Sequence, residues 1–278
     1  FMTHRHCQNV GNLTARICTY MHFNSKFILH CLVAGYVHDV GKLFIDPKIL
    51  HKDGKLTPEE FEIMKTHTTL GYEYCMKDHN LMYYSDGPWY HHEALNGTGY
   101  PRGLTKKDIP LSGQIIRVAD EYDALVTKRH YKTHVNISET LKDMIVDTEP
   151  PKNVVALDFL KQNQHLGKIN KKPLKALFKV VIDDILYEIA GICNYINYLK
   201  DQLKRLRTVE SYDKKIQAAH SERTKEYYGA GMKMLLKPGE TIENYQQLIV
   251  EFSDAIVARE DRIKQLYNEI KIIKKLKV

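Results

Sequence analysis

Hydrophobic residues recur along this chain at intervals of three and four positions, which is the spacing of one face of an α-helix. Residues 6–20, 26–37 and 174–190 all follow this pattern. No segment shows the strict alternation of apolar and polar residues that marks a half-buried β-strand, and no internal repeat is evident. The pattern therefore predicts an all-α fold.

Local signals predict where further helices begin. Thr57 is a residue that can cap a helix, and it is followed by a proline and, three positions after the cap, by Glu60. We expect the helix that starts here to carry His67. Glycine, proline, asparagine and threonine then concentrate in residues 97–110, which predicts an ordered loop before helix resumes near Ser112.

From about residue 192 onward the chain shows two long helical patterns, separated by a Lys-Pro-Gly break at 237–239. Apolar residues in the second pattern alternate at intervals of three and four, with Arg259 as the exception: Ile249, Phe252, Ile256, Ile263, Leu266, Ile270 and Ile273. This spacing is typical of a coiled coil or a helical hairpin, and it also fits a helix packed along the preceding domain. We expect one helical domain over 1–190 and a helical C-terminal extension over 191–278.

Composition excludes several classes of protein. With 278 residues, of which 43% are hydrophobic, the chain can bury a sizeable core, so it is neither largely disordered nor collagen-like. The longest apolar stretch, around 27–37, is interrupted by His30 and Gly35 and is shorter than the roughly 18–20 residues that a membrane-spanning helix needs. The sequence shows no basic segment followed by an apolar block, so we expect no secretory signal.

The cysteines and the net charge exclude few functions by themselves. The chain has five cysteines, and they form no CxxC pair: Cys7, Cys18, Cys31, Cys75 and Cys193. A zinc finger or a disulfide framework is therefore not expected, and a reducing cytoplasm fits this pattern better. The formal net charge of +7 suits an anionic ligand. Its excess lies mostly in the last third of the chain, where solvated helix faces explain it better than a nucleic-acid-binding surface does.

Histidine is concentrated in the first third, with ten of the 14 residues before position 93. His38 and Asp39 follow an apolar helix, and His91, His92 and Glu93 follow an aromatic segment. Adjacent ligands near a helix end can point at neighbouring metal ions. Imidazole and carboxylate ligands without thiolate favour Fe, Mn, Co or Zn over a structural cysteine–zinc site.

Asp120 is a third candidate, because it lies in an apolar helical frame. A carboxylate among hydrophobic residues needs a compensating cation, and a metal ion is one such partner. Pairing with Arg117, or capping of a helix, would satisfy Asp120 equally well.

Taken together and in order, these motifs resemble the HD-GYP family. They are His38-Asp39 with Gly41 and Lys42, then His67, His91-His92-Glu93, Gly99-Tyr100-Pro101 and the segment 118–125, VADEYDAL. The family is the branch of the HD superfamily whose members are metal-dependent phosphodiesterases of cyclic di-GMP. The resemblance covers about residues 6–190 and implies an HD-domain helical bundle that hydrolyses cyclic di-GMP to pGpG through a metal-activated bridging water; a further cut to GMP stays open.

The resemblance also implies a ligand set for two divalent transition-metal ions, Fe or Mn. Its seven members in this chain are His6, His38, Asp39, His67, His91, His92 and Asp120. We expect His6, His38 and Asp120 on one ion. We expect the other three histidines on the second ion, with Asp39 as the bridge. Family members with three metals carry a glutamate at the place that Met2 holds here, which favours two ions.

Further roles follow from the same resemblance. Asp39 and Lys42 are expected to act directly in catalysis, with Lys42 at the substrate phosphate. Tyr100 would shape the nucleotide groove. Arg129 and Lys132 match basic residues expected at the second phosphate, although His130 replaces the usual proline between them. Glu93 and Asp123 are expected to orient ligands or helices rather than to bind metal.

Other functions stay open at this point. The same centre could act on another cyclic dinucleotide, such as cyclic GMP-AMP, or the domain could be a catalytically quiet signalling or interaction module. The expected partner is a cyclic dinucleotide, with no nucleic-acid polymer and no membrane segment. A homodimer through the C-terminal helices and a role in bacterial signalling in the cytoplasm complete the expectation.

Overall fold

The computed structural model describes residues 2–129, 137–148 and 167–277, with the side chains of Met2, Thr3, Lys128 and Arg129 left out. Within these ranges the secondary structure is helical, and the only β-type pairing is an isolated bridge between Asn96 and Thr105. The all-α prediction is confirmed. The chain divides into two compact units, Phe1–Ile182 with Ile272–Val278, and Asp183–Lys271.

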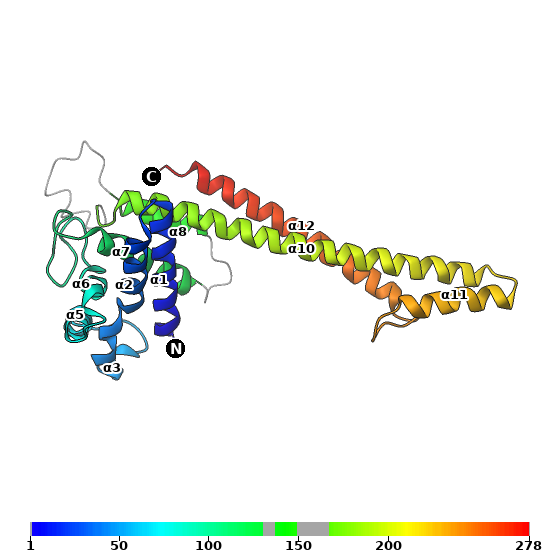
Figure 1. Ribbon diagram of the computed structural model, residues 1–278, viewed down its shortest axis with the longest axis horizontal. Helices are drawn as coiled ribbons and strands as arrows, with labels where there is room; N and C mark the ends of the chain where they lie inside the picture. Colours follow the sequence, from blue (N-terminus) through cyan, green and yellow to red (C-terminus); the bar gives the residue numbers. More distant parts are fainter. Residues whose placement is uncertain (1, 130–136, 149–166, 278) are drawn as a thin grey trace. The chain divides into compact units, whose positions relative to one another are not determined.

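The first unit is a bundle of short helices (Figure 1). Its elements are α1 (Met2–Tyr20), α2 (Ser25–Val37), the 3₁₀ helix η1 (Val40–Phe44), α3 (Pro47–Leu50), α4 (Pro58–Lys65), α5 (His67–Lys77), the 3₁₀ helix η2 (Met82–Tyr84), α6 (Asp86–Tyr90), α7 (Leu111–Arg129), α8 (Ile137–Val146) and the start of α10 (Lys171–Gln217). Helix α1 packs against α2 and α7, while α5 packs against η1 and α6. These contacts bring the carboxy-terminal ends of α2 and α6, and the middle of α7, near α1.

Helices α1 and α2 approach each other through glycines. A Cβ atom on Gly35 would lie 2.8 Å from the Cα atom of Gly11, so only glycine permits this backbone separation. Fully buried apolar side chains surround the crossing, among them Val10 and Ile17 on α1. The close crossing fixes where the end of α2, with its His-Asp pair, lies relative to the start of α1.

The helix predicted from residue 57 begins as expected but ends early. The Thr57 hydroxyl accepts the backbone N–H of Glu60 at 3.2 Å, and the Glu60 carboxylate accepts that of Thr57 at 2.7 Å. The expectation that this helix carries His67 was wrong, because α4 ends at Lys65. The Thr66 hydroxyl donates to the carbonyl of Ile63, and a side chain that binds the local backbone competes with helix continuation. His67 is instead the first residue of α5.

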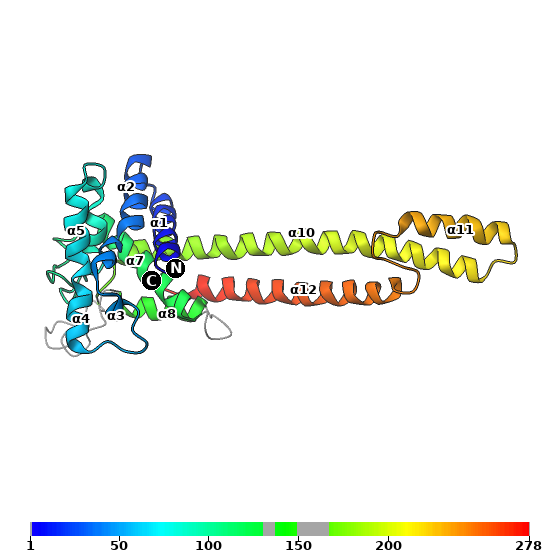
Figure 2. The ribbon, with the colours of Figure 1, turned by 90° about the horizontal axis from the view of Figure 1, so that it is seen from below.

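The second unit contains the rest of α10, α11 (Glu222–Leu235) and most of α12 (Tyr245–Lys275). Two breaks separate these helices, at 218–221 and 236–244, so the single predicted break was incomplete. Figure 2 shows α12 running alongside α10, and α11 beside the carboxy-terminal part of α10. Because α10 is continuous from 171 to 217, the expected division at 190/191 falls inside a helix.

The apolar stripe predicted on α12 packs against α10 within this unit. Ile256 joins a buried cluster with Ile196, Leu199 and Leu203, and Ile249, Phe252 and Ile263 pack beside it. The exception, Arg259, places its guanidinium 4.6 Å from the ring centroid of Tyr195, where a cation and an aromatic face attract each other. Apolar packing therefore holds α10 and α12 together as a helical hairpin.

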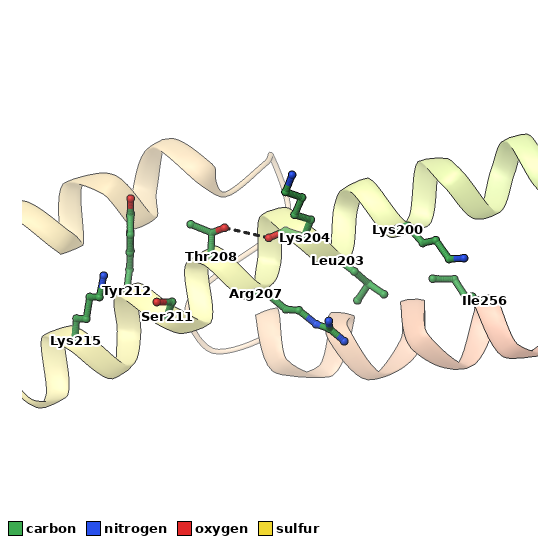
Figure 3. A pocket seen from close by; sticks show the side chains of 9 residues that line it. All are labelled: Lys200, Leu203, Lys204, Arg207, Thr208, Ser211, Tyr212, Lys215 and Ile256. Atoms are coloured by element: carbon green, nitrogen blue, oxygen red, sulfur yellow. Dashed lines mark hydrogen bonds between the residues drawn. The ribbon is translucent and has the colours of Figure 1, made fainter.

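Positive charge gathers along one face of α10. Lys200, Lys204, Arg207 and Lys215 line a shallow groove of about 690 Å³ (Figure 3). Several cations elsewhere on the unit pair with surface acids, for example Arg262 with Glu188 at 3.0 Å. Such exposed pairs contribute little stability, and they agree with the solvated helix faces expected from the sequence.

Among the residues that the structure describes, one segment is long and apolar enough to cross a membrane. It covers Ser25–Phe44, with a mean hydropathy of 1.2. In the structure this segment consists of α2 and η1, which are interrupted at His38 and Asp39. Helix α2 packs against α1, α6 and α7. A helix of a protein core passes the same test, so the segment is weak evidence for a membrane span.

Candidate metal centre

The seven predicted ligands come from separate parts of the first unit and lie together in the structure. His6 lies on α1, and His38 and Asp39 lie between α2 and η1. His67 begins α5. His91 and His92 directly follow α6, and Asp120 lies on α7. Apart from the adjacent pairs, these side chains meet only because the helices pack as they do.

One group of ligand atoms contains a carboxylate and three imidazoles. Asp39, His67, His91 and His92 each offer one atom within 4.8 Å of the others. The Nε2 atoms of His67 and His91 are 3.2 Å apart. They lie 3.5 and 3.7 Å from Oδ1 of Asp39. Four such atoms around one point suit a transition-metal ion.

A second group lies on the other side of Asp39. His6, His38 and Asp39 again offer atoms within 4.8 Å of one another. Oδ2 of Asp39 is 3.8 Å from Nε2 of His6 and 3.4 Å from Nε2 of His38. Asp120 adds its Oδ1, at 3.0 and 3.7 Å from the same two nitrogens. The two oxygens of Asp39 therefore face different groups of histidines.

Hydrogen bonds on the far side of each ring orient the histidines. Nδ1 of His38 donates to the carbonyl of Gly35 at 2.7 Å, and Nδ1 of His67 donates to that of Met64 at 2.6 Å. Nδ1 of His91 lies 3.0 Å from the Gly87 carbonyl. A carbonyl only accepts, so Nδ1 carries a proton in each ring, and whenever the ring is neutral its Nε2 presents a lone pair towards Asp39. Metal-binding histidines are oriented in this way.

Two buried atoms of the centre lack a hydrogen bond. They are Nε2 of His38 and Oδ1 of Asp39, among the residues that the structure describes. An unsatisfied buried polar atom costs about 1–3 kcal/mol. Both atoms face the other ligands at 3.4–3.7 Å, too far for strong hydrogen bonds and suitable for a shared cation. The residues therefore fit a metal centre.

Electrostatics give the two groups different protonation. Burial would raise the pKa of Asp39, but His38, His91 and Lys42 hold it well below its usual range. Burial, together with the charge of His91, lowers the pKa of His67 to about 4. Burial would also lower the pKa of His6, yet Asp120 and Asp123 outweigh it and raise that pKa to about 9. Metal binding must therefore displace more protons from the group that contains His6 and Asp120 than from the group that contains His67.

The amino-terminal half of the chain matches a family model. The model describes the HD domain and matches residues 1–149, which is more than half of the chain and contains all seven side chains. The chain belongs to the HD domain family. The HD-GYP resemblance of its motifs is confirmed at the level of the family, since curated relatives of this HD domain are cyclic-dinucleotide phosphodiesterases by name.

Two of these relatives show how far the similarity extends. A cyclic di-GMP phosphodiesterase of Thermotoga maritima is 42% identical over 144 residues, which are 51% of this chain and 39% of the relative. The 3'3'-cGAMP-specific phosphodiesterase 1 of Vibrio cholerae is 32% identical over 142 residues, 51% of this chain and 33% of the relative. Among solved structures, Bd1817, an HDG"Y"P protein from Bdellovibrio bacteriovorus, aligns over 64% of this chain and 52% of the Bd1817 chain. The TM-score of this alignment is 0.48, and the sequence identity is 19%. The chain thus spans well under half the length of these two curated relatives.

The predicted substrate residues lie at different distances from this centre. Nζ of Lys42 is 2.6 Å from Oδ2 of Asp39. The Tyr100 ring stacks on that of His92, with centroids 4.6 Å apart and an angle of 27° between the planes. Lys132 lies outside the described residues, as do the side chains of Arg129 and Met2. Their expected roles, and the expectation of two rather than three metal ions, stay predictions.

Glu93 and Asp123 contact other parts of the HD domain. The buried Glu93 carboxylate accepts the backbone N–H groups of Arg102 and Leu104 at 2.9 and 2.8 Å, which anchors the loop that contains Tyr100. The carboxylate of Asp123 accepts a hydrogen bond from Nδ1 of His6 at 2.7 Å.

Asn9 is a supporting residue that the sequence analysis missed. Its amide donates to Asp123 at 3.0 Å, on the same carboxylate that orients His6. The signal was available, because Asn9 lies three positions after His6 and so shares a helix face with it.

A second missed cluster supports α6, the helix that precedes His91 and His92. Nε2 of His30 lies 2.8 Å from Oδ2 of Asp86, the first residue of α6, and the Ser112 hydroxyl donates to the same oxygen. Nothing in the sequence pairs these residues, which are 56 and 26 positions apart. They tie α6 to α2 and α7.

Replacing His30 with glutamine should lower stability in a pH-dependent way. Asp86 raises the pKa of His30, although burial opposes the shift. A raised pKa means that the stabilisation is fully present below the unfolded value of about 6.5 and is lost as the pH rises through the folded value. We expect the variant to lose about 1 kcal/mol of unfolding free energy at pH 5.5 and less at pH 9.

Denaturant unfolding of the two proteins at both pH values measures this difference. His51→Gln, at an exposed histidine, is the matched control and should change little at either pH. A destabilisation of equal size at pH 5.5 and 9 would contradict the assigned charge on His30.

Proposed function

We propose that this chain is a metal-dependent phosphodiesterase that hydrolyses cyclic di-GMP to pGpG, with two divalent ions, Fe or Mn, held by the seven side chains. The observation that carries the proposal is the position of Asp39. Its Oδ1 faces His67 and His91, and its Oδ2 faces His6 and His38. One carboxylate between two groups of imidazoles is the arrangement expected of a bridging ligand in a two-metal site.

The kind of metal follows from the donors. Five imidazoles and two carboxylates, with no thiolate in either group, suit Fe or Mn and do not require zinc. Bound ions would supply a water of lowered pKa and would neutralise charge on the phosphodiester. The protein's part is to hold the ligands in place and to keep them deprotonated where a metal binds.

Lys42 contributes a positive charge rather than a base. Burial would lower its pKa, but Asp39 outweighs burial and raises it, so the ammonium stays protonated at neutral pH. A fixed cation beside Asp39 can offset the charge that develops on a phosphate oxygen during hydrolysis. We place the scissile phosphate next to Lys42 for this reason.

Lys42→Ala should keep its metal and slow hydrolysis. We expect a loss of about 10²-fold in kcat/KM for cyclic di-GMP, the size of effect seen when one electrostatic donor is removed. Elemental analysis and initial rates on the same preparation measure the two quantities. Lys48→Ala, an exposed lysine of α3, is the control and should leave both unchanged. An unaltered rate for Lys42→Ala would remove its role at the phosphate.

The proposed reaction is tested directly with anaerobically purified protein. Cyclic di-GMP should be converted to pGpG, and chromatography at long times shows whether GMP follows. The second candidate substrate is cyclic GMP-AMP, favoured by the 3'3'-cGAMP-specific relative. A panel of cyclic dinucleotides ranks the substrates, and a protein that binds them without turnover would instead be a quiet signalling module.

Two further expectations belong to the same proposal. A homodimer through the C-terminal helices is supported by apolar side chains on the outer faces of α10 and α12, such as Tyr187 at 84% and Val257 at 57% exposure. Light scattering of the purified chain tests it.

A cytoplasmic location is supported by the five cysteines, none of which forms a disulfide.

A further inference from the structure

A row of aromatic rings leads away from the metal centre towards α4. Tyr100 stacks on His92, as described above, and lies 6.5 Å from the ring of His67. The Phe61 ring follows, with its centroid 6.2 Å from that of Tyr100 and an angle of 80° between the planes. Phe61 is 46% exposed, so one of its surfaces is open to solvent beside the centre.

A lysine lies over the same two rings. Nζ of Lys65 is 5.5 Å from the centroid of Phe61 and 5.9 Å from that of Tyr100. Phe61 and Lys65 are four residues apart on α4 and so share a face of that helix. Lys65 pairs with Glu62 at 2.6 Å, but the Glu62 side chain is 69% exposed. An exposed ion pair of this kind is weak and can be exchanged for a stronger anion.

Core packing does not account for this arrangement. None of the residues of α4 is buried, and the helix is held at its start by the capping box of Thr57. An exposed aromatic ring and a cation on one face of a short helix form a surface for a planar, anionic ligand. Cyclic di-GMP offers both features, because its macrocycle contains two anionic phosphates and carries two planar purine bases.

We infer that Phe61 and Lys65 bind the part of the cyclic dinucleotide that extends from the scissile phosphate, Phe61 by contact with a purine base and Lys65 by contact with the nearby phosphate. This inference rests on the proposed function and adds a binding surface on α4 to it. Aromatic rings bind bases with little sequence preference because every base has a π-face. Lysine binds phosphate as a point charge.

The experiment compares two substrates in the metal-loaded protein. Cyclic di-GMP would use both the metal centre and α4, whereas methyl p-nitrophenyl phosphate offers one small diester that reaches only the centre. We expect Phe61→Ala to raise KM for cyclic di-GMP by about 5- to 160-fold, the range of one base–aromatic stack. Its kcat/KM for the small diester and its metal content should not change. Lys65→Ala should raise KM for cyclic di-GMP in the same selective way.

Controls separate the aromatic contact from a structural role. Phe61→Trp should restore most of the affinity, because it keeps an aromatic face. Phe61→Leu keeps apolar bulk on α4 without that face, so it should behave like Phe61→Ala even if the alanine variant is less stable. Ile63→Ala removes a side chain of the same helix with a similar exposure, 45%, and should not affect either substrate.

The outcomes distinguish this inference from the proposed function. A wild-type KM for cyclic di-GMP in both Phe61→Ala and Phe61→Leu would overturn the inference while leaving the phosphodiesterase intact. If the wild-type protein cleaves the small diester but not cyclic di-GMP, the proposed substrate is wrong. Calorimetric binding of cyclic di-GMP to the wild-type and Phe61→Leu proteins then decides the inference separately: equal affinities would overturn it, and weaker binding by the variant would support it.

Discussion

Asp39→Ala should abolish both metal binding and phosphodiester hydrolysis. Asp39 is the only residue that belongs to both groups of ligand atoms among the described residues, so its loss weakens each group at once. Its removal also leaves the ammonium of Lys42 and the buried ring of His38 without their shared carboxylate. We expect a loss of at least about 10³-fold in kcat, because both metal-dependent contributions to hydrolysis disappear together.

Elemental analysis and cyclic di-GMP turnover on anaerobic preparations measure this effect. Asp39→Asn is the sharper comparison, since it preserves the shape of the side chain but supplies one neutral oxygen in place of a bridging carboxylate. Asp46→Ala removes an exposed acid that only caps α3, and it should cost some stability without loss of metal. Full activity and full metal content in Asp39→Ala would show that the metal assignment is wrong.

Gly41→Ala should destabilise the protein and separate two parts of the metal centre. A Cβ atom at this position would overlap the carbonyl oxygen of His67 and lie 2.6 Å from the amide nitrogen of Gly71. Both are backbone atoms, so η1 and α5 would have to move apart. Asp39 immediately precedes η1 and His67 begins α5, and the move would therefore also lengthen the distance between these two ligands. We expect a loss of about 3 kcal/mol of unfolding free energy and most of the activity.

Thermal unfolding and metal content measure the effect of Gly41→Ala. For a chain of this size, about 3 kcal/mol corresponds to a decrease in Tm of roughly 6–12 °C. Gly191→Ala is the control: this exposed glycine lies inside α10, and a Cβ atom there meets no other atom within 4 Å. Alanine should be neutral or stabilising by up to about 1 kcal/mol at that position. A wild-type Tm for Gly41→Ala would contradict the close contact between η1 and α5.

The sequence was sufficient for the features that depend on neighbouring residues. Helical spacing of apolar side chains identified α1, α2 and the hairpin helices, because a helix repeats its environment every three to four residues. The cap at Thr57 could be read from four residues for the same reason. Where two local preferences competed, as at Thr66, the sequence analysis did not detect the hydrogen bond that ends α4.

The motifs also identified the candidate ligands, but only as residue types in an order. That His6 lies beside Asp123, 117 positions away, and that the two oxygens of Asp39 face different histidine groups, are properties of helix packing. The tie between His30 and Asp86 and the approach of Phe61 to Tyr100 are of the same kind. Local pattern thus determined the helices and the chemical types of the ligands. Only the tertiary structure decided which atoms meet, because distances between residues far apart in the chain depend on how all the helices pack.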